Sequence, residues 1–366
     1  MVKSIAIIVY DSSVLGGAEK VAFSLANELS SCYHVTLLSL QGDTVHPALA
    51  AGNAVPVRFL QIPADRLRSQ VFSALIPLVS FLRDCHIDVA LVEGNYCGFL
   101  CSFARLFVGT KLIFCDHGSF LSQYNERSIR TIRRLSTILC QHTVVLTERS
   151  RNDYIRFFRI PENRISCIYN WPDLCGSDPD SRYRSDSRTI ISVGRFGREK
   201  GYDLLVKVAA IVLPKHKDWN WVIYGDGETF EEIKTEVQRN HLDRQLILAG
   251  VKQDLRDVYK NASFLVLPSY REGMPLVLLE AKSFHLPLVS FDIVSGPREI
   301  IQDRVNGYLI EPYNIVGMAE AVEKLISDPK LRQTMSDHAY DNMQQFEKAS
   351  IVKKWRDLID ALGDRI

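Results

Sequence analysis

Short, almost unbroken apolar runs alternate along this chain with longer segments in which apolar residues recur every three or four positions. In the first half the runs cover residues 4–10, 34–40, 88–94, 111–115, 142–147 and 164–169. In the second half they cover residues 189–194, 220–225, 246–249, 263–268, 286–291 and 307–310. Continuous apolar runs are typical of parallel strands that are buried on both faces. Many of the intervening segments have the period of a helix, as Ala18, Val21, Ala22, Leu25 and Leu29 do.

This strand–helix rhythm occurs twice and predicts an α/β protein with two doubly wound, Rossmann-like domains. A length of 366 residues suits two domains of ordinary size. The stretch 171–187 is rich in proline, aspartate and serine and has no periodicity, so it marks the boundary. We therefore expect one domain over 1–172, a linker over 173–187 and a second domain over 188–344. A final helix is expected over 345–366, with Trp355 and Ile359 on its apolar face.

Composition narrows the class of protein further. The chain has 44 basic and 43 acidic residues, which argues against a dedicated nucleic-acid binder. Its eight cysteines form no C-x-x-C pair, so we expect reduced thiols rather than a zinc site or a disulfide framework. The longest apolar stretch, 71–82, is too short to cross a bilayer, and the first run shows no signal peptide. A cytoplasmic protein is the resulting expectation.

The segment Gly194–Gly201 and the segment Glu272–Glu280 carry the chemistry. Arg195 and Lys200 lie in a glycine-punctuated turn just after a predicted strand, and their fixed charges suit a diphosphate. Two glutamates stand eight residues apart across a loop-to-helix junction, a span of at most about 12 Å in a helix. That span is comparable to the separation of a sugar hydroxyl from the ribose in a nucleotide sugar, and each carboxylate can accept hydrogen bonds from a hydroxyl pair.

Pro275 adds an anion site to this junction. Proline is tolerated at the first helical position, so the amides of Leu276 and Val277 would face an anion, aided by the helix dipole. A strand ends and a helix begins here, which is where doubly wound folds bind ligands. The two segments together predict a site for a nucleotide diphosphate joined to a sugar, although isolated glutamates, loop cations and glycine turns also occur as ordinary surface features.

The motifs G-R-x4-K-G and E-x7-E resemble the signature of retaining glycosyltransferases of family 4, the group 1 glycosyl transferases with the GT-B fold. The resemblance extends over nearly the whole chain and includes Gly16-Gly17 after the first strand, Asp116-His117-Gly118 and Tyr224-Gly225-Asp226-Gly227. It implies two domains that face a central cleft, with the donor on the second domain and the acceptor on the first. It also implies that the C-terminal helix crosses back to the first domain.

The resemblance assigns roles to individual residues. Glu272 would bind hydroxyls of the donor sugar and Glu280 the ribose, while Arg195 and Lys200 would stabilise the leaving diphosphate without a metal or another cofactor. With His117 at a strand end, the catalytic set is Arg195, Lys200, Glu272 and His117. The donor-binding set adds Gly16, Gly17, Gly250, Val251, Gly273, Met274, Pro275, Leu276, Val277 and Glu280. Candidates for acceptor contacts, chosen largely by position, are Asn95, Tyr96, Asp116 and Ser119.

The resemblance implies transfer of a hexose or N-acetylhexosamine, with retention, from a UDP-sugar to a glycan or polyprenyl-diphosphate-linked glycan. The expected setting is bacterial surface polysaccharide synthesis, of O-antigen or capsule, at the cytoplasmic face of the inner membrane. The basic cluster Arg127, Arg130, Arg133 and Arg134 is either a solvated helix face or a peripheral contact with anionic lipid. The alternatives are a soluble-acceptor transferase, a nucleotide-sugar epimerase on the same fold, and a non-catalytic nucleotide-sugar-binding module.

Overall fold

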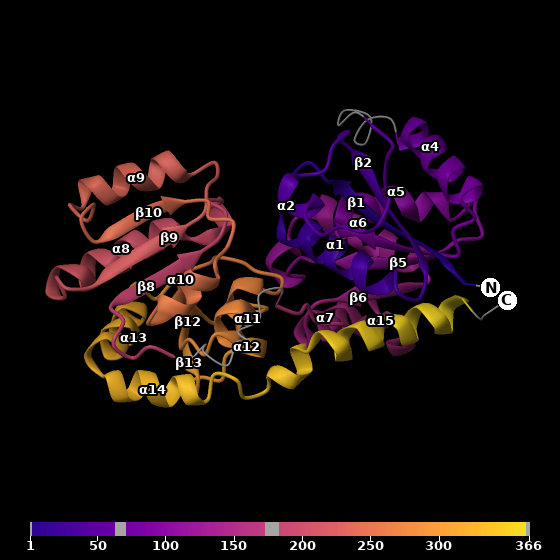
Figure 1. Ribbon diagram of the computed structural model, residues 1–366. Helices are drawn as coiled ribbons and strands as arrows, with labels where there is room; N and C mark the ends of the chain where they lie inside the picture. The colour runs from indigo at the N-terminus through magenta and orange to yellow at the C-terminus, as the bar shows by residue number, and fades with distance from the viewer. Residues whose placement is uncertain (1, 63–70, 173–182, 364–366) are drawn as a thin grey trace. The chain divides into compact units, whose positions relative to one another are not determined.

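The computed structural model describes residues 2–62, 71–172 and 183–363 (Figure 1). The chain forms two compact units. Unit 1 consists of Met1–Asn170 together with Lys348–Ile366, and unit 2 consists of Trp171–Glu347. Most of the predicted linker, residues 173–182, lies outside the described residues. Each unit contains one parallel sheet with helices on its two sides (Figure 1).

The sheet of unit 1 has seven parallel strands in the order β3-β2-β1-β4-β5-β6-β7. The strands are β1 (Ser4–Asp11), β2 (His34–Gln41), β3 (Val57–Phe59), β4 (Val89–Glu93), β5 (Lys111–Asp116), β6 (His142–Val145) and β7 (Ile165–Cys167). The helices are α1 (Gly17–Leu29), α2 (Pro47–Ala50), α4 (Val71–Asp84), α5 (Gly94–Ala104), α6 (Arg127–Leu139), α7 (Glu148–Phe158) and α15 (Lys348–Gly363). The central strands are fully buried, as the continuous apolar runs require.

The sheet of unit 2 has six parallel strands in the order β10-β9-β8-β11-β12-β13. The strands are β8 (Thr189–Val193), β9 (Asn220–Tyr224), β10 (Leu246–Gly250), β11 (Phe264–Leu267), β12 (Leu288–Phe291) and β13 (Gly307–Ile310). The helices are α8 (Tyr202–Val212), α9 (Phe230–Arg239), α10 (Arg256–Asn261), α11 (Leu276–Ser283), α12 (Pro297–Ile300), α13 (Ile315–Ser327) and α14 (Pro329–Asp337).

The predicted fold class, two doubly wound α/β sheets, is confirmed. Each of the twelve predicted runs contains a strand whose ends lie within two residues of the expected ones. The sequence pattern missed β3, because its three residues Val-Arg-Phe are too few to stand out as an apolar run. In the part of the chain that the structure describes, no helix combines the length and the apolarity needed to cross a membrane.

Helix α15 belongs to unit 1 and packs against α1 (Figure 1). Its apolar face, which includes Ile351, Trp355 and Ile359, is buried. Polar contacts fix its last turns, since the Lys3 ammonium and the Tyr33 hydroxyl both donate to Oδ1 of Asp360 at 3.0 Å. The end of the chain is therefore held beside its beginning, where β1 starts.

Both sheets change direction at an interior strand. In unit 1 the chain builds outward from β1 through β2 to β3 and then returns to place β4 on the other side of β1. In unit 2 it builds from β8 through β9 to β10 and returns to place β11 beside β8. The loops that leave the carboxyl ends of the two strands at such a reversal diverge and leave room for a ligand. The positions after β1 and β4, and after β8 and β11, are thus the expected ligand sites.

Candidate active site

The loops after β8 and β11 bring a lysine and a glutamate together in unit 2. Lys200 Nζ lies 2.7 Å from Glu272 Oε1, although the residues are 72 positions apart in sequence. The hydroxyl of Ser269 donates to the same carboxylate oxygen at 2.7 Å. The lysine is half-buried and the glutamate almost fully buried, so the ion pair is held in place by its surroundings rather than formed by two mobile surface groups.

Glycines allow these loops to pack this closely. Gly201 has φ +67°, and a Cβ at that position would overlap the carbonyl oxygen of Pro268 in the loop after β11. Gly225, after β9, lies equally close to the Gly194 carbonyl. A side chain at either position would push neighbouring loops apart. The predicted turn Tyr224–Gly227 therefore supports the loop Gly194–Gly201 from the side.

Arg195 does not join the ion pair. Its guanidinium donates to Glu199 Oε1 at 2.9 Å and its side chain is mostly exposed. Burial raises the pKa of Glu199, but its backbone hydrogen bond and the nearby Arg195 guanidinium outweigh this, and the net pKa is lowered. The structure thus brings Lys200 and Glu272 together and leaves Arg195 on the outer side of the same loop.

Helix α11 begins one residue later than predicted. Pro275 is its N-cap, with extended φ −74° and ψ 104°, and Leu276 is the first helical residue. The amides of Leu276 and Val277 remain at the helix N-terminus, where no intrahelical acceptor exists for them. One turn further on, Glu280 is only 3% exposed and accepts a hydrogen bond from the Tyr259 hydroxyl at 2.8 Å. The two glutamates of E-x7-E therefore lie in different surroundings, Glu272 at the loop and Glu280 inside the wall.

A third loop completes this site. The Ser295 hydroxyl donates to the Glu272 carbonyl at 2.8 Å. Gly296 has φ +98°, and a Cβ there would lie 3.0 Å from the Gly273 carbonyl oxygen and 2.8 Å from Pro275 Cδ. Met274 is buried between these loops. The segment before α12 thus supports the Glu272 loop, a role that sequence reasoning did not assign because the contact joins distant residues.

The predicted nucleobase segment lies two strands from β8. Gly250 ends β10 with φ +70°, and its carbonyl accepts a hydrogen bond from the amide of Gly225 at 2.8 Å. The next residue, Val251, is 69% exposed. An apolar side chain held in solvent at the carboxyl edge of the sheet is available to pack against a planar ligand.

The corresponding site in unit 1 contains a histidine and two glutamates. His117 follows β5, Glu93 is the last residue of β4, and Glu19 lies in the first turn of α1. His117 Nε2 forms an ion-pair contact with Glu93 Oε2. Burial lowers the pKa of His117, but the carboxylates of Glu93, Asp116 and Glu19 outweigh it, and the net pKa is raised.

Sequence reasoning did not single out Glu93 and treated Glu19 as an ordinary first-turn residue. A signal for Glu93 exists in retrospect. It is the one charged residue in Val-Ala-Leu-Val-Glu, at the carboxyl end of a buried strand next to the reversal of the sheet.

Asp116 is a structural anchor, which corrects its assignment as an acceptor contact. It is almost fully buried; its carboxylate lies 2.9 Å from Nε of Arg133 and accepts a hydrogen bond from the Tyr154 hydroxyl at 2.6 Å. Arg133 is 1% exposed, so it is not part of a surface cluster with Arg127 and Arg134. Ser119 is likewise buried. The predicted basic surface therefore shrinks to its exposed members.

The remaining candidates of unit 1 lie at helix N-termini. Gly16 is the N-cap of α1 and Gly17 its first residue, with no atom near the place of a Cβ. Asn95 and Tyr96 lie in the first turn of α5 rather than in a loop, because this helix begins at Gly94, where the predicted strand was to end. The ring of Tyr96 contacts that of Tyr10, with centroids 5.6 Å apart, and is half exposed.

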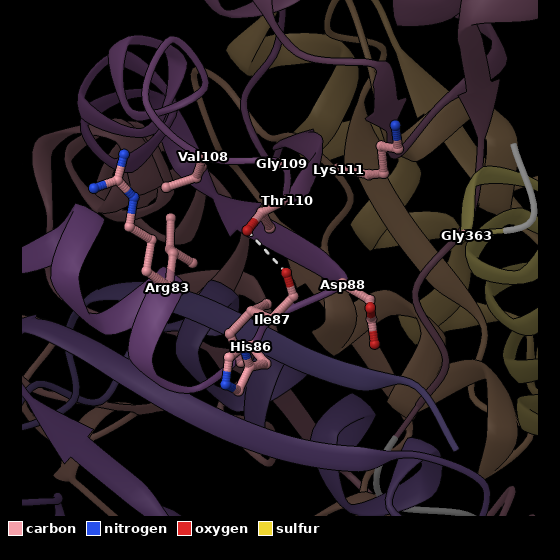
Figure 2. A pocket seen from close by; sticks show the side chains of 10 residues that line it. Arg83, His86, Ile87, Asp88, Val108, Gly109, Thr110, Lys111 and Gly363 are labelled. Carbon is pink, nitrogen blue, oxygen red and sulfur yellow. Dashed lines mark hydrogen bonds between the residues drawn. The ribbon is translucent and has the colours of Figure 1, made fainter. Parts of the chain in front are cut away.

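A separate hollow lies at the opposite edge of the unit 1 sheet. It is lined by residues at the amino ends of β4 and β5, including Asp88, Thr110 and Lys111, and by Arg83 and His86 from the end of α4 (Figure 2). Figure 2 shows the charged side chains of Arg83, Asp88 and Lys111 pointing away from one another. The hollow therefore lacks converging groups and is distinct from the site at His117.

Comparison with known proteins covers most of the chain. Residues 15–174 match the family model described as Glycosyltransferase Family 4, and residues 177–342 match that of Glycosyl transferases group 1. An uncharacterized glycosyltransferase of Haemophilus influenzae is 27% identical over 98% of this chain and 100% of its own length. The amylovoran biosynthesis glycosyltransferase AmsD of Erwinia amylovora is 27% identical over 94% of this chain and 96% of its own.

Solved structures show the same fold. TarM of S. aureus, in complex with fondaparinux, α-GlcNAc-glycerol and UDP, superposes with a TM-score of 0.83 at 16% identity, over 98% of this chain and 100% of that one. HepE of Anabaena, in complex with UDP-glucose, gives a TM-score of 0.82 at 17% identity, over 98% of this chain and 99% of that one. The two parallel sheets of seven and six strands are those of the GT-B fold.

The buried arginine of α6 can be tested against its exposed neighbour. Replacing Arg133 by Met leaves Asp116 as an uncompensated buried charge, so we expect the free energy of unfolding to fall by about 3 to 5 kcal/mol. Replacing the exposed Arg134 by Met should change it by no more than about 0.5 kcal/mol. Urea unfolding followed by far-UV circular dichroism measures both. Equal effects of the two substitutions would contradict the anchoring role of Asp116.

Proposed function

Since the chain belongs to the group 1 glycosyl transferases, the retaining hexosyltransferases of glycosyltransferase family 4, we propose that it transfers a hexose or an N-acetylhexosamine from a UDP-sugar to a glycan acceptor. The observation that carries this proposal is the ion pair of Lys200 and Glu272 at the reversal of the unit 2 sheet. It joins a cation suited to phosphate and a carboxylate suited to sugar hydroxyls at one point, as a nucleotide sugar requires.

Donor binding exchanges the partners of this pair. The phosphate oxygens of the diphosphate take up Lys200, and the amides of Leu276 and Val277 at the start of α11 add donors of the same polarity. Glu272, released from the lysine, accepts hydrogen bonds from hydroxyls of the sugar. The side chain of Arg195, which lies on the outer side of the same loop, supplies a second cation to the diphosphate.

The nucleoside lies further along the sheet in this proposal. Glu280 binds the ribose hydroxyls, and Gly250 with the exposed Val251 borders the base. The bound UDP or UDP-glucose of the similarly folded TarM and HepE supports uridine as the base. The glycines Gly16 and Gly17 at the start of α1 allow the backbone of unit 1 to approach the transferred sugar.

We propose a front-face displacement for the chemical step. The bond from the anomeric carbon to the phosphate oxygen breaks as the bond to the acceptor oxygen forms on the same face, which retains the configuration. The acceptor proton passes to the departing phosphate oxygen. Lys200 and Arg195 stabilise the charge that develops on that phosphate, so the step needs no metal ion.

The acceptor proposal rests on relatives. The name of AmsD places it in amylovoran biosynthesis, and a Campylobacter jejuni relative, 25% identical over 94% of this chain, is named as acting on an undecaprenol-diphosphate-linked glycan. We therefore infer a glycan or a polyprenyl-diphosphate-linked glycan of a bacterial surface polysaccharide, elongated at the cytoplasmic face of the inner membrane. The stereocentres of the sugar and the linkage follow from assay.

Peripheral membrane contact is part of the same proposal. The exposed Arg127 and Arg134 of α6, with Ile138 52% exposed on the same helix, combine cationic and apolar groups that suit an anionic lipid surface. We expect the protein to float with vesicles that contain phosphatidylglycerol and to remain unbound to neutral vesicles. Flotation that is unchanged in an Arg127→Glu, Arg134→Glu double variant would contradict a contact through α6.

The role of Lys200 is tested by a matched pair of lysines. We expect Lys200→Met to lower kcat for sugar transfer by about 100- to 1000-fold, because it removes a charge that stabilises the leaving phosphate. Lys207→Met, at an exposed position of the adjacent helix α8, should leave kcat unchanged. Initial rates with labelled UDP-sugars and membrane glycolipid as acceptor, measured with a chelator present, decide this. A Lys200→Met enzyme with near wild-type kcat would overturn the proposed role.

A further inference from the structure

The topology of unit 1 gathers three titratable side chains at the reversal of its sheet. Glu19 comes from the helix that follows β1, Glu93 ends β4, and His117 follows β5. In the parallel register Glu93 pairs with Cys115. Because side chains two residues apart on a strand point to the same face, His117 extends over the same face as Glu93.

The imidazole of His117 is surrounded by carboxylates. Its Nε2 contacts Glu93 Oε2, and both side chains are largely buried. The other charged groups that act on it are Asp116 from β5 and Glu19 from α1. The nearby cation, Arg133 of α6, is paired with Asp116. Among the described groups that influence the imidazole, the negative charges outweigh the positive ones.

Electrostatics and geometry agree on the charge of this histidine. Burial alone lowers the pKa of His117, yet the facing carboxylates, Glu93 first among them, leave it raised. Burial raises the pKa of Glu19, which the positive His117 opposes. The thiol of Cys115 beside Glu93 also has a raised pKa, through burial and then through the charge of Glu93. It stays neutral and does not compete with the imidazole as a charged partner of Glu93.

We propose that Glu93 is a positioning residue that holds His117 as an imidazolium, which serves as a hydrogen-bond donor to a substrate oxygen and not as a general base. The Nε2–H donates to Glu93, so Nδ1–H is the donor that remains for a sugar hydroxyl or a phosphate oxygen. An imidazolium has no lone pair to accept a proton. This inference rests on the proposed transferase function, and it explains why the acceptor proton passes to the leaving phosphate.

The alternative role for a buried histidine–carboxylate pair is a base. In that arrangement the carboxylate orients a neutral imidazole, which takes the proton of the attacking hydroxyl. The two roles need opposite protonation states of His117. A change that lowers the pKa of His117 therefore reduces the working form of an imidazolium donor and increases the working form of a base, which gives the experiment a sign.

The first measurement is the titration of His117 by NMR in the free, full-length protein. The wild-type imidazole should titrate above the ordinary value of about 6.5, and Glu93→Gln should lower its pKa by about one to three units. Glu19→Gln, at a half-buried position, should lower it by less. Glu162→Gln, at an exposed position of unit 1, serves as the control and should leave it unchanged. An unchanged pKa in Glu93→Gln would overturn the proposal.

The second measurement is the pH dependence of kcat/KM for sugar transfer. The alkaline limb should move to lower pH in Glu93→Gln while the rates at acid pH stay the same, and His117→Gln should remove that limb. Higher activity of Glu93→Gln at acid pH would identify His117 as a base and overturn the imidazolium role. The NMR titration needs no activity, so a raised pKa in a protein that transfers no sugar would reject the function and keep the pair. Near-UV circular dichroism confirms that each variant is folded.

Discussion

The contact between the loops that follow β8 and β11 determines the geometry of the candidate active site. Because the two strands are neighbours at the reversal of the sheet, residues 72 positions apart form the Lys200–Glu272 ion pair at 2.7 Å. The backbone of Gly201 packs on the Pro268 carbonyl, and Ser269 holds the glutamate from its other side. A site built this way offers a cation and a carboxylate already in place, so the donor exchanges their partners without reorganising the loops.

Unit 1 repeats the construction with different residues. The buried Arg133 and Tyr154 fix Asp116, which also accepts a hydrogen bond from the amide of Gly118 at 3.0 Å. Both neighbours of His117 are thereby held, and Glu93 then determines the orientation and the charge of its ring. Asp116 thus contributes to the site without touching a ligand. Each unit places one buried carboxylate next to one cationic side chain at the reversal of its sheet.

The fold was predictable because parallel strands buried on both faces leave continuous apolar runs, and twelve of them stand out in the sequence. The short edge strand β3 leaves no such run. The partners of Lys200 and Glu272 could be placed near each other from the strand ends alone. The pairing of Arg133 with Asp116 could not, because it depends on which face of α6 meets the sheet, and the sequence shows four similar arginines. Glu93 was missed because a charged residue at the end of a strand is ordinarily solvated.

The central claim is that the Lys200–Glu272 pair opens to receive a nucleotide sugar. Calorimetric titration with UDP and with a panel of UDP-sugars, in the presence of a chelator, tests it most directly in the wild type and in Glu272→Gln. The account predicts that one UDP-hexose or UDP-N-acetylhexosamine binds the wild type more tightly than UDP does, and that Glu272→Gln keeps the affinity for UDP but loses the advantage of the sugar. An absence of binding by every nucleotide sugar, or a sugar preference that survives in Glu272→Gln, would contradict it.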